Sequence, residues 1–261
     1  MMSEGKFMIR KWKAGKTVVM SKFPVGNATK PRAKKKKGAT PSYKKMQNDM
    51  SAVRTLTRTI DCNFKHGDFW ITLKYDDGKY QKLLSKLEAA GMELTPDNIR
   101  LEAIHERDLF LRRVKRNMTE KGLDLQYVSV TSDIDGDTGN AVRVHHHILV
   151  NKEAFEFIFK HWRKDILRYD PLRDQDSYAA LAEYLIRQVR RQPEKKKYTT
   201  SKNLKKPELI SEAVVSDSGE LVVPKGAKVL QRSPYDVDKN PSQYICYVPK
   251  AEKKKRGGKR E

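Results

Sequence analysis

Three consecutive histidines lie inside a short apolar and β-branched segment, Val142 to Val150, with the sequence V-R-V-H-H-H-I-L-V. Such a segment is typical of a buried β-strand. Because side chains alternate along a strand, we expect His145 and His147 on one face and His146 on the other. Two imidazoles on one face of a strand can hold one divalent ion. The alternative interpretation is a pair of hydrogen-bonded core histidines or an exposed cluster, so the rest of the chain must decide between the two.

Strands and helices alternate along the chain, with a hairpin near its middle. Asp68–Tyr75, Leu125–Thr131 and Ala141–Val150 have the composition of strands, and the acidic turn D-I-D-G-D-T-G-N joins the last two. This order favours an α+β fold with a mainly antiparallel central sheet and flanking helices over a doubly wound parallel fold. We expect helices at Gln47–Ile60, Lys79–Ala90, Thr95–Lys121, Asn151–Trp162 and Ser177–Arg191, and further short strands around Val214, Leu221–Val223, Val229 and Tyr244–Val248.

The chain is strongly basic: 55 lysines and arginines against 33 aspartates and glutamates give a net charge of +22 over 261 residues. A charge of this size predicts a polyanionic partner, with nucleic acid as the first candidate. An anionic membrane surface is the competitor, but it requires a basic amphipathic helix or a lipidation signal, and the sequence has no convincing example of either. Without an apolar run of membrane-spanning length, a secretory leader or a cysteine framework, the sequence predicts a cytoplasmic protein with no membrane partner.

Composition divides the chain into four parts. Residues 1–45 are polar and basic and include the block Lys34–Lys37, which predicts a disordered arm. Residues 46–195 carry the regular helices and strands and are expected to form the main domain. Residues 196–250 are expected to form a small β-containing extension packed on that domain, and residues 251–261 a basic tail.

Two segments are similar to motifs of other protein classes, a P-loop and a calcium loop, but each lacks residues that its motif requires. Gly15–Thr17 matches the end of a phosphate-binding P-loop, but Arg10 stands where the first glycine is needed and no strand is expected before the segment. ATP binding is therefore not expected. The acidic turn that begins at Asp133 is similar to a calcium loop but lacks the glycine and the final glutamate of such loops, so we interpret it as a hairpin turn.

Tyr184 is the candidate nucleophile. It lies in A-E-Y-L-I-R-Q, on a predicted amphipathic helix. A tyrosine beside a metal-bound phosphate can attack phosphorus and leave a covalent phosphotyrosine. A neighbouring cation would lower the pKa of its phenol, and Arg187, one helical turn later, is the expected source of that charge. For an isolated tyrosine, the alternative is a residue of an amphipathic core.

Taken together, these segments resemble the three motifs of HUH endonucleases, most closely those of the rolling-circle replication initiators of plasmids and single-stranded DNA phages. The first motif corresponds to Phe69–Tyr75, F-W-I-T-L-K-Y, and the second to His145–Val150, H-H-H-I-L-V. The third, a tyrosine followed three residues later by a basic residue, corresponds to Tyr184 and Arg187. The resemblance covers roughly residues 45 to 250. Each motif is short, and their order and spacing carry the specificity.

The resemblance implies a ferredoxin- or RRM-like HUH catalytic core in residues 46–195. It implies that His145 and His147 hold Mg²⁺ or Mn²⁺, that Tyr184 attacks a scissile phosphate, and that Arg187 accompanies it. The activity would be that of a DNA endonuclease and strand transferase that initiates rolling-circle replication through a 5′-phosphotyrosine. The partners would be single-stranded or melted origin DNA and a host helicase and polymerase. The alternatives are a relaxase or single-tyrosine transposase with the same chemistry, or a non-catalytic nucleic-acid-binding regulator.

The chain departs from the family pattern at three positions. Arg187 stands where lysine is usual, and arginine keeps the charge but cannot exchange a proton near neutral pH. Ser132 stands where many relatives have a glutamate as the third metal ligand, so the neighbouring Asp133 is the candidate ligand in its place. Tyr178 lies six residues before Tyr184, off the spacing of two-tyrosine relatives, which favours a single nucleophile.

Overall fold

The computed structural model describes residues 6–25, 42–162, 167–189, 196–216, 219–233 and 242–250. The chain forms two compact units, one made of Gly38–Lys205 and the other of Met1–Lys37 together with Lys206–Glu261. Each unit has its own antiparallel sheet, so the fold contains a second sheet beyond the single central one that the sequence predicts.

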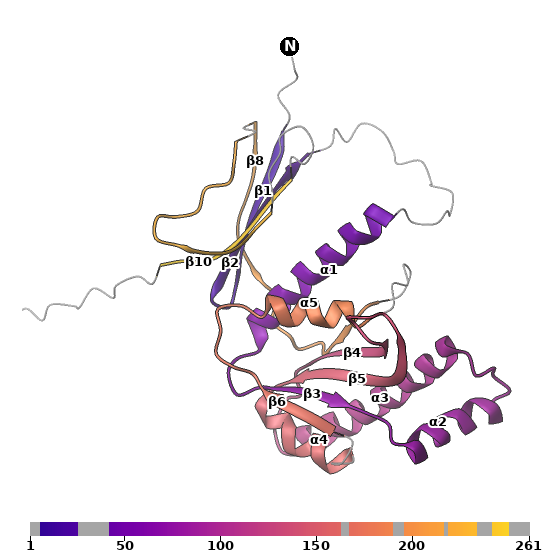
Figure 1. The fold of residues 1–261 in the computed structure, drawn as a ribbon. Coiled ribbons are helices and arrows are strands. Elements are labelled where there is room, and N and C mark those ends of the chain that lie inside the picture. The colour runs from indigo at the N-terminus through magenta and orange to yellow at the C-terminus, as the bar shows by residue number, and fades with distance from the viewer. Residues whose placement is uncertain are drawn as a thin grey trace, which may run out of the picture. The chain divides into compact units, whose positions relative to one another are not determined.

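The described part of the larger unit contains the strands β3 (Phe69–Leu73), β4 (Tyr127–Ile134), β5 (Ala141–Val150), β6 (Leu167–Pro171) and β7 (Thr199–Thr200). They form one sheet in the order β6-β3-β5-β4-β7, with every neighbouring pair antiparallel. The strand with the three histidines, β5, is the central one (Figure 1). The expected α+β class with a mainly antiparallel sheet is confirmed, whereas the edge strand β6 is not among the predicted elements.

The register of this sheet aligns polar residues from three neighbouring strands. His147 of β5 lies opposite Thr72 of β3, and Thr72 lies opposite Arg168 of β6. His145 lies opposite Ser132 of β4. Directly opposite residues in an antiparallel sheet share a face. One face of the sheet therefore carries both His145 and His147 together with Thr72 and Arg168.

Helices cover both faces of the sheet of the larger unit (Figure 1). One face packs against α2 (Asp77–Ala89), α3 (Pro96–Thr119) and α4 (Phe155–His161), the last preceded by the short helix η1 (Lys152–Ala154). The other face packs against α1 (Ser42–Asn63) and α5 (Ala179–Arg187). Among the helices described, none has both the length and the apolar character needed to cross a bilayer.

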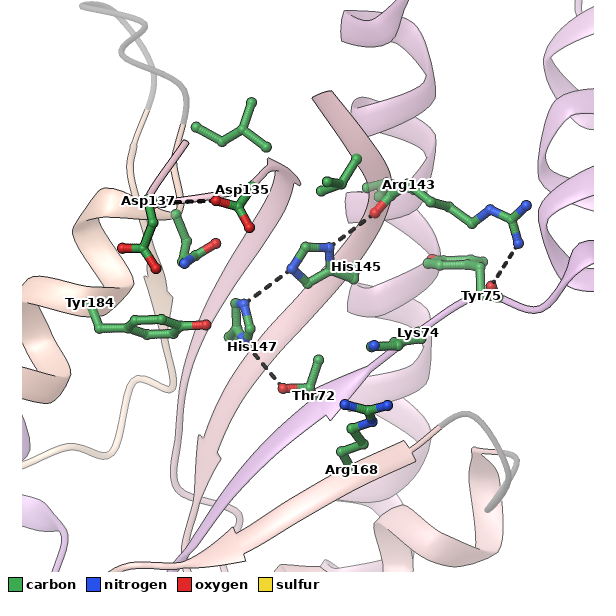
Figure 2. Close-up of a pocket in the computed structure, with 14 residues that line it drawn as sticks. Thr72, Lys74, Tyr75, Asp135, Asp137, Arg143, His145, His147, Arg168 and Tyr184 are labelled. Atoms are coloured by element: carbon green, nitrogen blue, oxygen red, sulfur yellow. Dashed lines mark hydrogen bonds between the residues drawn. The ribbon is translucent and has the colours of Figure 1, made fainter. Parts of the chain in front are cut away.

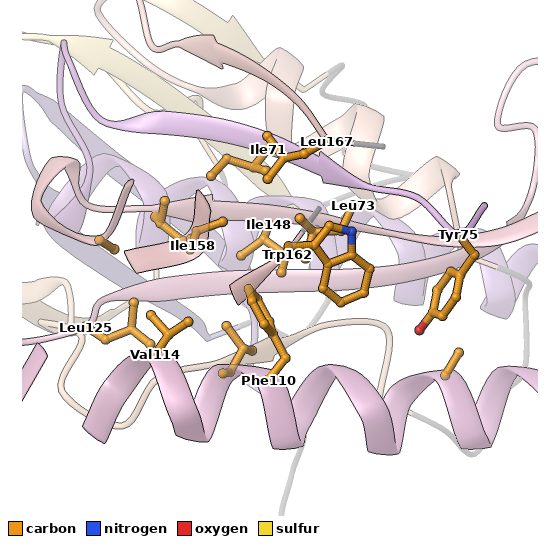
Figure 3. Close-up of a cluster of buried hydrophobic side chains, with 14 of the residues drawn as sticks. Ile71, Leu73, Tyr75, Phe110, Val114, Leu125, Ile148, Ile158, Trp162 and Leu167 are labelled. Carbon is orange, nitrogen blue, oxygen red and sulfur yellow. The ribbon is translucent and has the colours of Figure 1, made fainter. Parts of the chain in front are cut away.

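The face covered by α2, α3 and α4 forms the larger of two hydrophobic cores in this unit. Leu73 of β3 and Ile148 of β5 pack there against Phe110 and Val114 of α3, with Trp162 beside them (Figure 3). Full burial of side chains of this size contributes about 1.5–3 kcal/mol each to folding. This core therefore fixes the position of β5, and with it the direction in which the histidines project.

Local sequence signals set the ends of the helices in this core. The α3 helix begins after Thr95, whose hydroxyl accepts a hydrogen bond from a backbone N–H of the first turn, and Pro96 occupies the first helical position. The α2 helix begins after Asp76, whose carboxylate accepts from the Lys79 backbone N–H at 2.6 Å. Gly91, with a φ of +67°, follows the end of α2. Both predicted helices are confirmed.

The described part of the smaller unit contains β1 (Phe7–Ala14), β2 (Thr17–Pro24), β8 (Glu208–Val215), β9 (Lys228–Arg232) and β10 (Gln243–Val248). These strands form an antiparallel sheet in the order β8-β1-β2-β10-β9. Three of them confirm the short strands expected around Val214, Val229 and Tyr244–Val248. The predicted strand at Leu221–Val223 is wrong, because this segment is irregular and Leu221 packs on the sheet next to Ile245.

The prediction of a disordered arm over residues 1–45 is wrong for residues 7–24. These residues form a hairpin whose strands pair with β8 and β10, so the N-terminal segment belongs to a folded unit. Its strands contain lysines, which the composition argument counts against folding. Lys22, however, is buried, and its ammonium donates to the Gly219 carbonyl oxygen at 2.6 Å. The block Lys34–Lys37 and the tail 251–261 lie outside the described residues.

Two further expectations need correction. The predicted boundary between residues 195 and 196 moves, because β7 pairs with β4 and the smaller unit resumes only at Lys206. A strand, β1, does precede the P-loop-like segment Gly15–Thr17, contrary to expectation. That segment nevertheless forms a hairpin turn followed by a strand, whereas a P-loop leads into a helix.

Candidate active site

One pocket of the larger unit contains most of the residues that the sequence identifies as functional. It has a volume of about 450 Å³ and lies over the sheet face that carries His145 and His147 (Figure 2). Tyr184 reaches it from α5. The strands, the segment after β3 and the β4–β5 turn supply further lining residues, among them Thr72, Lys74, Tyr75, Asp135, Asp137 and Arg168.

The two imidazoles in the pocket are oriented by hydrogen bonds on their Nδ1 atoms. Nδ1 of His145 lies 3.0 Å from the Arg143 carbonyl oxygen. A carbonyl only accepts, so this nitrogen carries the proton and Nε2 keeps its lone pair. Nδ1 of His147 lies 3.2 Å from the Thr72 hydroxyl oxygen, and the two Nε2 atoms face each other at 3.2 Å. Holding Nδ1 in this way directs Nε2 toward a ligand, as in metal-binding histidines.

Burial keeps both imidazoles neutral. Desolvation lowers the pKa of His147 to about 3, with smaller contributions from the charges of His145 and Lys74. The pKa of His145 is also lowered, mainly by burial, with Lys74 acting in the same direction. A neutral imidazole is the form that binds metal. At neutral pH the pair therefore offers lone pairs rather than positive charge.

The spacing of the two nitrogens fits a single divalent ion. Ligands about 2.0–2.1 Å from one ion are about 2.8–3.4 Å apart at octahedral or tetrahedral angles, and the two Nε2 atoms are 3.2 Å apart. Within the described residues, no group of three or more His, Cys, Asp or Glu side chains could hold a metal ion together. The protein donors assembled there are thus the two imidazoles.

Asp133, the candidate third ligand, is not brought into a three-donor group. It is buried, with 6% of its surface exposed, and follows Ser132 where the pairing of β4 with β5 becomes irregular. Its carboxylate raises the pKa of His145, an effect smaller than that of burial. Asp135 and Asp137, rather than Asp133, line the pocket.

The ring of Tyr184 packs directly against the histidine pair. Its centroid lies 5.6 Å from that of His147 and 5.6 Å from that of Trp70, both in edge-to-face arrangements. Trp70 in turn stacks on His147, with centroids 5.1 Å apart and planes inclined by 24°. The Tyr184 hydroxyl points toward His147 (Figure 2). The structure therefore brings Tyr184, His145 and His147 together.

The amphipathic pattern of α5 explains this position of Tyr184. Ala182, Leu185 and Ile186 are buried in the second core of this unit, which α1 and the sheet complete. Tyr184 lies beside this buried stripe and is only partly buried, so its ring covers the edge of the core while its hydroxyl enters the pocket.

The expected effect of Arg187 on the Tyr184 phenol is confirmed in direction, but the pKa of the phenol is raised overall. Arg187 does act in that direction, but burial, followed by the charges of Asp137 and Asp135, raises the pKa overall. The Arg187 guanidinium also lies 3.5 Å from an Asp137 carboxylate oxygen, and both side chains are largely exposed. Helical spacing predicts the cation on the same helix but not the carboxylates of the β4–β5 turn.

Removing one of these carboxylates should lower the pKa of the phenol. In Asp137→Asn we expect a downward shift in the pKa of Tyr184, measured by NMR titration of ¹³C-labelled tyrosine, with a stability change within about 0.5 kcal/mol. Asp124→Asn, an exposed substitution whose carboxylate does not act on Tyr184, should leave that pKa unchanged. An unchanged or higher pKa in Asp137→Asn would contradict the assigned cause.

His146, the middle histidine, projects to the opposite face of the sheet, as the alternation predicts. It is fully buried, with Nδ1 2.9 Å from the Thr131 hydroxyl and Nε2 3.0 Å from the Tyr75 hydroxyl. Arg107, also buried, donates to the Thr131 hydroxyl at 3.0 Å. Burial is the main reason why the pKa of His146 falls well below its ordinary value. For this residue, the interpretation as a hydrogen-bonded core histidine holds.

This buried histidine makes stability depend on pH. Its pKa is lowered in the folded state, so below an unfolded-state pKa of about 6.5 the unfolded chain binds more protons and the free energy of unfolding falls as pH falls. His146→Phe should make that dependence shallower by up to about 1.4 kcal/mol per pH unit, measured by urea unfolding between about pH 6 and pH 5. His105→Ala, at an exposed position, should keep the wild-type slope. Equal slopes in all three proteins would contradict the assignment.

Several pocket residues were missed as functional residues by the sequence argument. Thr72 and Lys74 lie within the first motif, and strand alternation places them on one face with Trp70. This signal was available in the sequence. Asp137 and Arg168 come from a turn and from an edge strand, and only the folded arrangement brings them to the pocket.

Comparison of the chain with family models, curated proteins and solved structures finds no match. The resemblance to HUH endonucleases therefore depends on the three short motifs alone.

Proposed function

We propose that this protein is a metal-dependent DNA nicking and strand-transfer enzyme that initiates rolling-circle replication through a 5′-phosphotyrosine on Tyr184. One observation carries the proposal: the Tyr184 hydroxyl points toward a pair of neutral imidazoles whose Nε2 atoms are 3.2 Å apart. A nucleophile next to a metal-binding pair is the arrangement that phosphoryl transfer requires. The net charge of +22 supports a polyanionic substrate.

In this proposal His145 and His147 hold Mg²⁺ or Mn²⁺ through Nε2. When bound there, the ion would polarise the scissile phosphoryl oxygen and favour ionisation of the neighbouring phenol. The protein prepares the pair by burying it, by fixing Nδ1 of His145 on the Arg143 carbonyl, and by holding Nδ1 of His147 at the Thr72 hydroxyl. Trp70 stacks on His147 and limits rotation of its ring.

Tyr184 acts as the nucleophile in the proposed reaction. Its oxygen forms a bond to phosphorus as the bond to O3′ breaks, the phenolic proton is released to solvent, and the departing O3′ takes up a proton. The upstream strand then ends in a 3′-hydroxyl, which a host polymerase can extend, while a host helicase unwinds the duplex. Transfer of the phosphoryl group back to a 3′-hydroxyl rejoins the strand, so the bond energy is conserved.

The test is formation of a covalent protein–DNA adduct. The full chain is incubated with Mn²⁺ and a pool of random-sequence single-stranded oligonucleotides labelled at the 3′ end, because the label must stay on the strand joined to tyrosine. We expect an adduct that survives SDS and is absent with EDTA, with the modified peptide containing Tyr184 by mass spectrometry. A mobility shift without any adduct would instead support a non-catalytic binder. Cleavage without an adduct would support a hydrolytic nuclease.

A further inference from the structure

Two cations line the pocket on the side of the histidine pair away from Tyr184. Lys74 follows β3 and Arg168 lies on the edge strand β6, and both side chains are exposed (Figure 2). The helix that carries Tyr184 packs against residues of β4 and β5 and against Trp70 of β3. In the pocket, Tyr184 lies on the other side of His147 from Lys74 and Arg168 (Figure 2). The nucleophile and these two cations therefore approach the imidazole pair from opposite sides.

The sheet register fixes this placement. Arg168 lies opposite Thr72, which lies opposite His147, so the three residues form a row across β6, β3 and β5. Neighbouring strands are about 4.8 Å apart, which puts the Arg168 backbone about 10 Å from that of His147. Lys74 lies two residues beyond Thr72 on the same face. Its side chain lines the same pocket as His145 and His147.

Lys74 and Arg168 differ from two nearby arginines, Arg143 of the pocket lining and Arg187 of α5. Arg143 forms an ion pair with Asp77 at 2.8 Å, and Arg187 lies 3.5 Å from Asp137. Within the part of the chain that the structure describes, no carboxylate pairs with Lys74 or Arg168. An exposed lysine and arginine without anionic partners, next to a phosphate-transfer site, suit the phosphates of a bound strand.

The geometry of phosphoryl transfer assigns the strand that these cations contact. The attacking and leaving oxygens lie roughly in line on opposite sides of phosphorus. If Tyr184 attacks from the α5 side, the departing O3′ faces Lys74 and Arg168. We propose that Lys74 and Arg168 bind the DNA segment on the 5′ side of the nick and keep its released 3′-hydroxyl in the pocket for the reverse transfer. This inference rests on the proposed nicking function.

The experiment separates the two halves of the DNA. The sequence of an oligonucleotide that forms the adduct is divided at its cleavage site, and fluorescence anisotropy measures the binding of each half to the full chain in EDTA. In the double variant Lys74→Ala/Arg168→Ala, we expect affinity for the upstream half to fall about tenfold or more, with little change for the downstream half. The dependence of log affinity on log salt should become shallower by about 0.7 for each cation removed.

A second readout follows religation. The isolated wild-type or variant adduct is mixed with increasing upstream oligonucleotide, and the variant should need about tenfold more of it for half-maximal rejoining. Lys82→Ala, an exposed lysine on α2 outside this pocket, is the matched control for charge and should behave as wild type. The charge-preserving variant Lys74→Arg should retain most of the affinity.

The outcomes distinguish this inference from the proposed function. Wild-type affinity for the upstream half in the double variant, or a loss confined to the downstream half, overturns the assignment of the subsite while the nicking function stands. Failure of the wild-type protein to form an adduct with any oligonucleotide overturns the nicking function, and the subsite assignment falls with it.

Discussion

Replacement of Tyr184 by phenylalanine is expected to abolish formation of the covalent DNA adduct while DNA binding persists. Loss of a covalent nucleophile lowers turnover by about 10⁴-fold or more. The phenylalanine ring keeps the packing on His147 and Trp70, so the pocket should retain its shape. Adduct yield with a labelled oligonucleotide and Mn²⁺, together with affinity measured in EDTA, checks both parts of the expectation.

Tyr178→Phe is the matched control for this variant. The Tyr178 hydroxyl donates to the Arg173 carbonyl oxygen at 3.2 Å, and its side chain is buried in the second core, so it does not line the pocket. We expect the adduct to form within about twofold of the wild-type rate, with a loss of stability of about 1 kcal/mol from the missing hydrogen bond. Loss of the adduct in this variant would revive a two-tyrosine mechanism.

An adduct that persists in Tyr184→Phe would show that another hydroxyl attacks. Tyr75 is the tyrosine to test next, because it also lines the pocket. It is a poorer candidate, since its side chain is buried, its hydroxyl lies 3.0 Å from His146 Nε2, and burial raises its pKa. Peptide mapping of the adduct distinguishes the two tyrosines directly.

The histidine faces illustrate what the sequence can determine. The two-residue period of a strand does not depend on its neighbours, so the assignment of His145 and His147 to one face and His146 to the other follows from β5 alone. The amphipathic pattern of α5 is equally local, and it turns Leu185 toward the core and leaves Tyr184 at its edge. These two patterns bring the proposed nucleophile and the imidazole pair onto the same side of the sheet.

The hairpin of residues 7–24 illustrates what local sequence cannot determine. Its strands are completed by β8 and β10, so that Phe7 pairs with Val215 and Val18 with Tyr247. These partners are nearly the whole chain apart in sequence. The polar, basic composition of residues 1–45 predicts disorder for this segment as a whole, although the apolar stems of lysines such as Lys11 and Lys13 are well accommodated in a paired sheet.

The electrostatics of the site show the same limit. Helical spacing identifies Arg187 as a neighbour of Tyr184. The carboxylates of Asp135 and Asp137, which have the opposite effect on the pKa of Tyr184, belong to the β4–β5 turn, far earlier in the chain. The interpretation of that turn as a hairpin is confirmed, but nothing local predicts that it reaches the helix that carries Tyr184. The irregular pairing after Ser132 similarly decides where Asp133 lies.

The second large effect is expected in His147→Ala, which should lose metal-dependent adduct formation by about 10³-fold or more and keep DNA binding. Removal of this imidazole leaves His145 alone, and one nitrogen cannot hold the ion at the scissile phosphate. Thr72→Val keeps the ring but removes the hydroxyl that lies 3.2 Å from its Nδ1. Loss of such a supporting partner typically costs about 10- to 100-fold in metal affinity or activity.

The Mn²⁺ concentration dependence separates these variants. Thr72→Val should shift the half-maximal Mn²⁺ concentration upward and recover activity at high metal, whereas His147→Ala should not recover. Electron paramagnetic resonance measures Mn²⁺ binding directly and does not depend on catalysis. Mn²⁺ affinity should be lower in Thr72→Val than in the wild type, and lower still in His147→Ala. His105→Ala replaces an exposed histidine on α3 and should match the wild type in both measurements. Adduct formation that survives both His147→Ala and EDTA would mean that the imidazole pair serves packing alone, and that Tyr184 attacks without a metal ion.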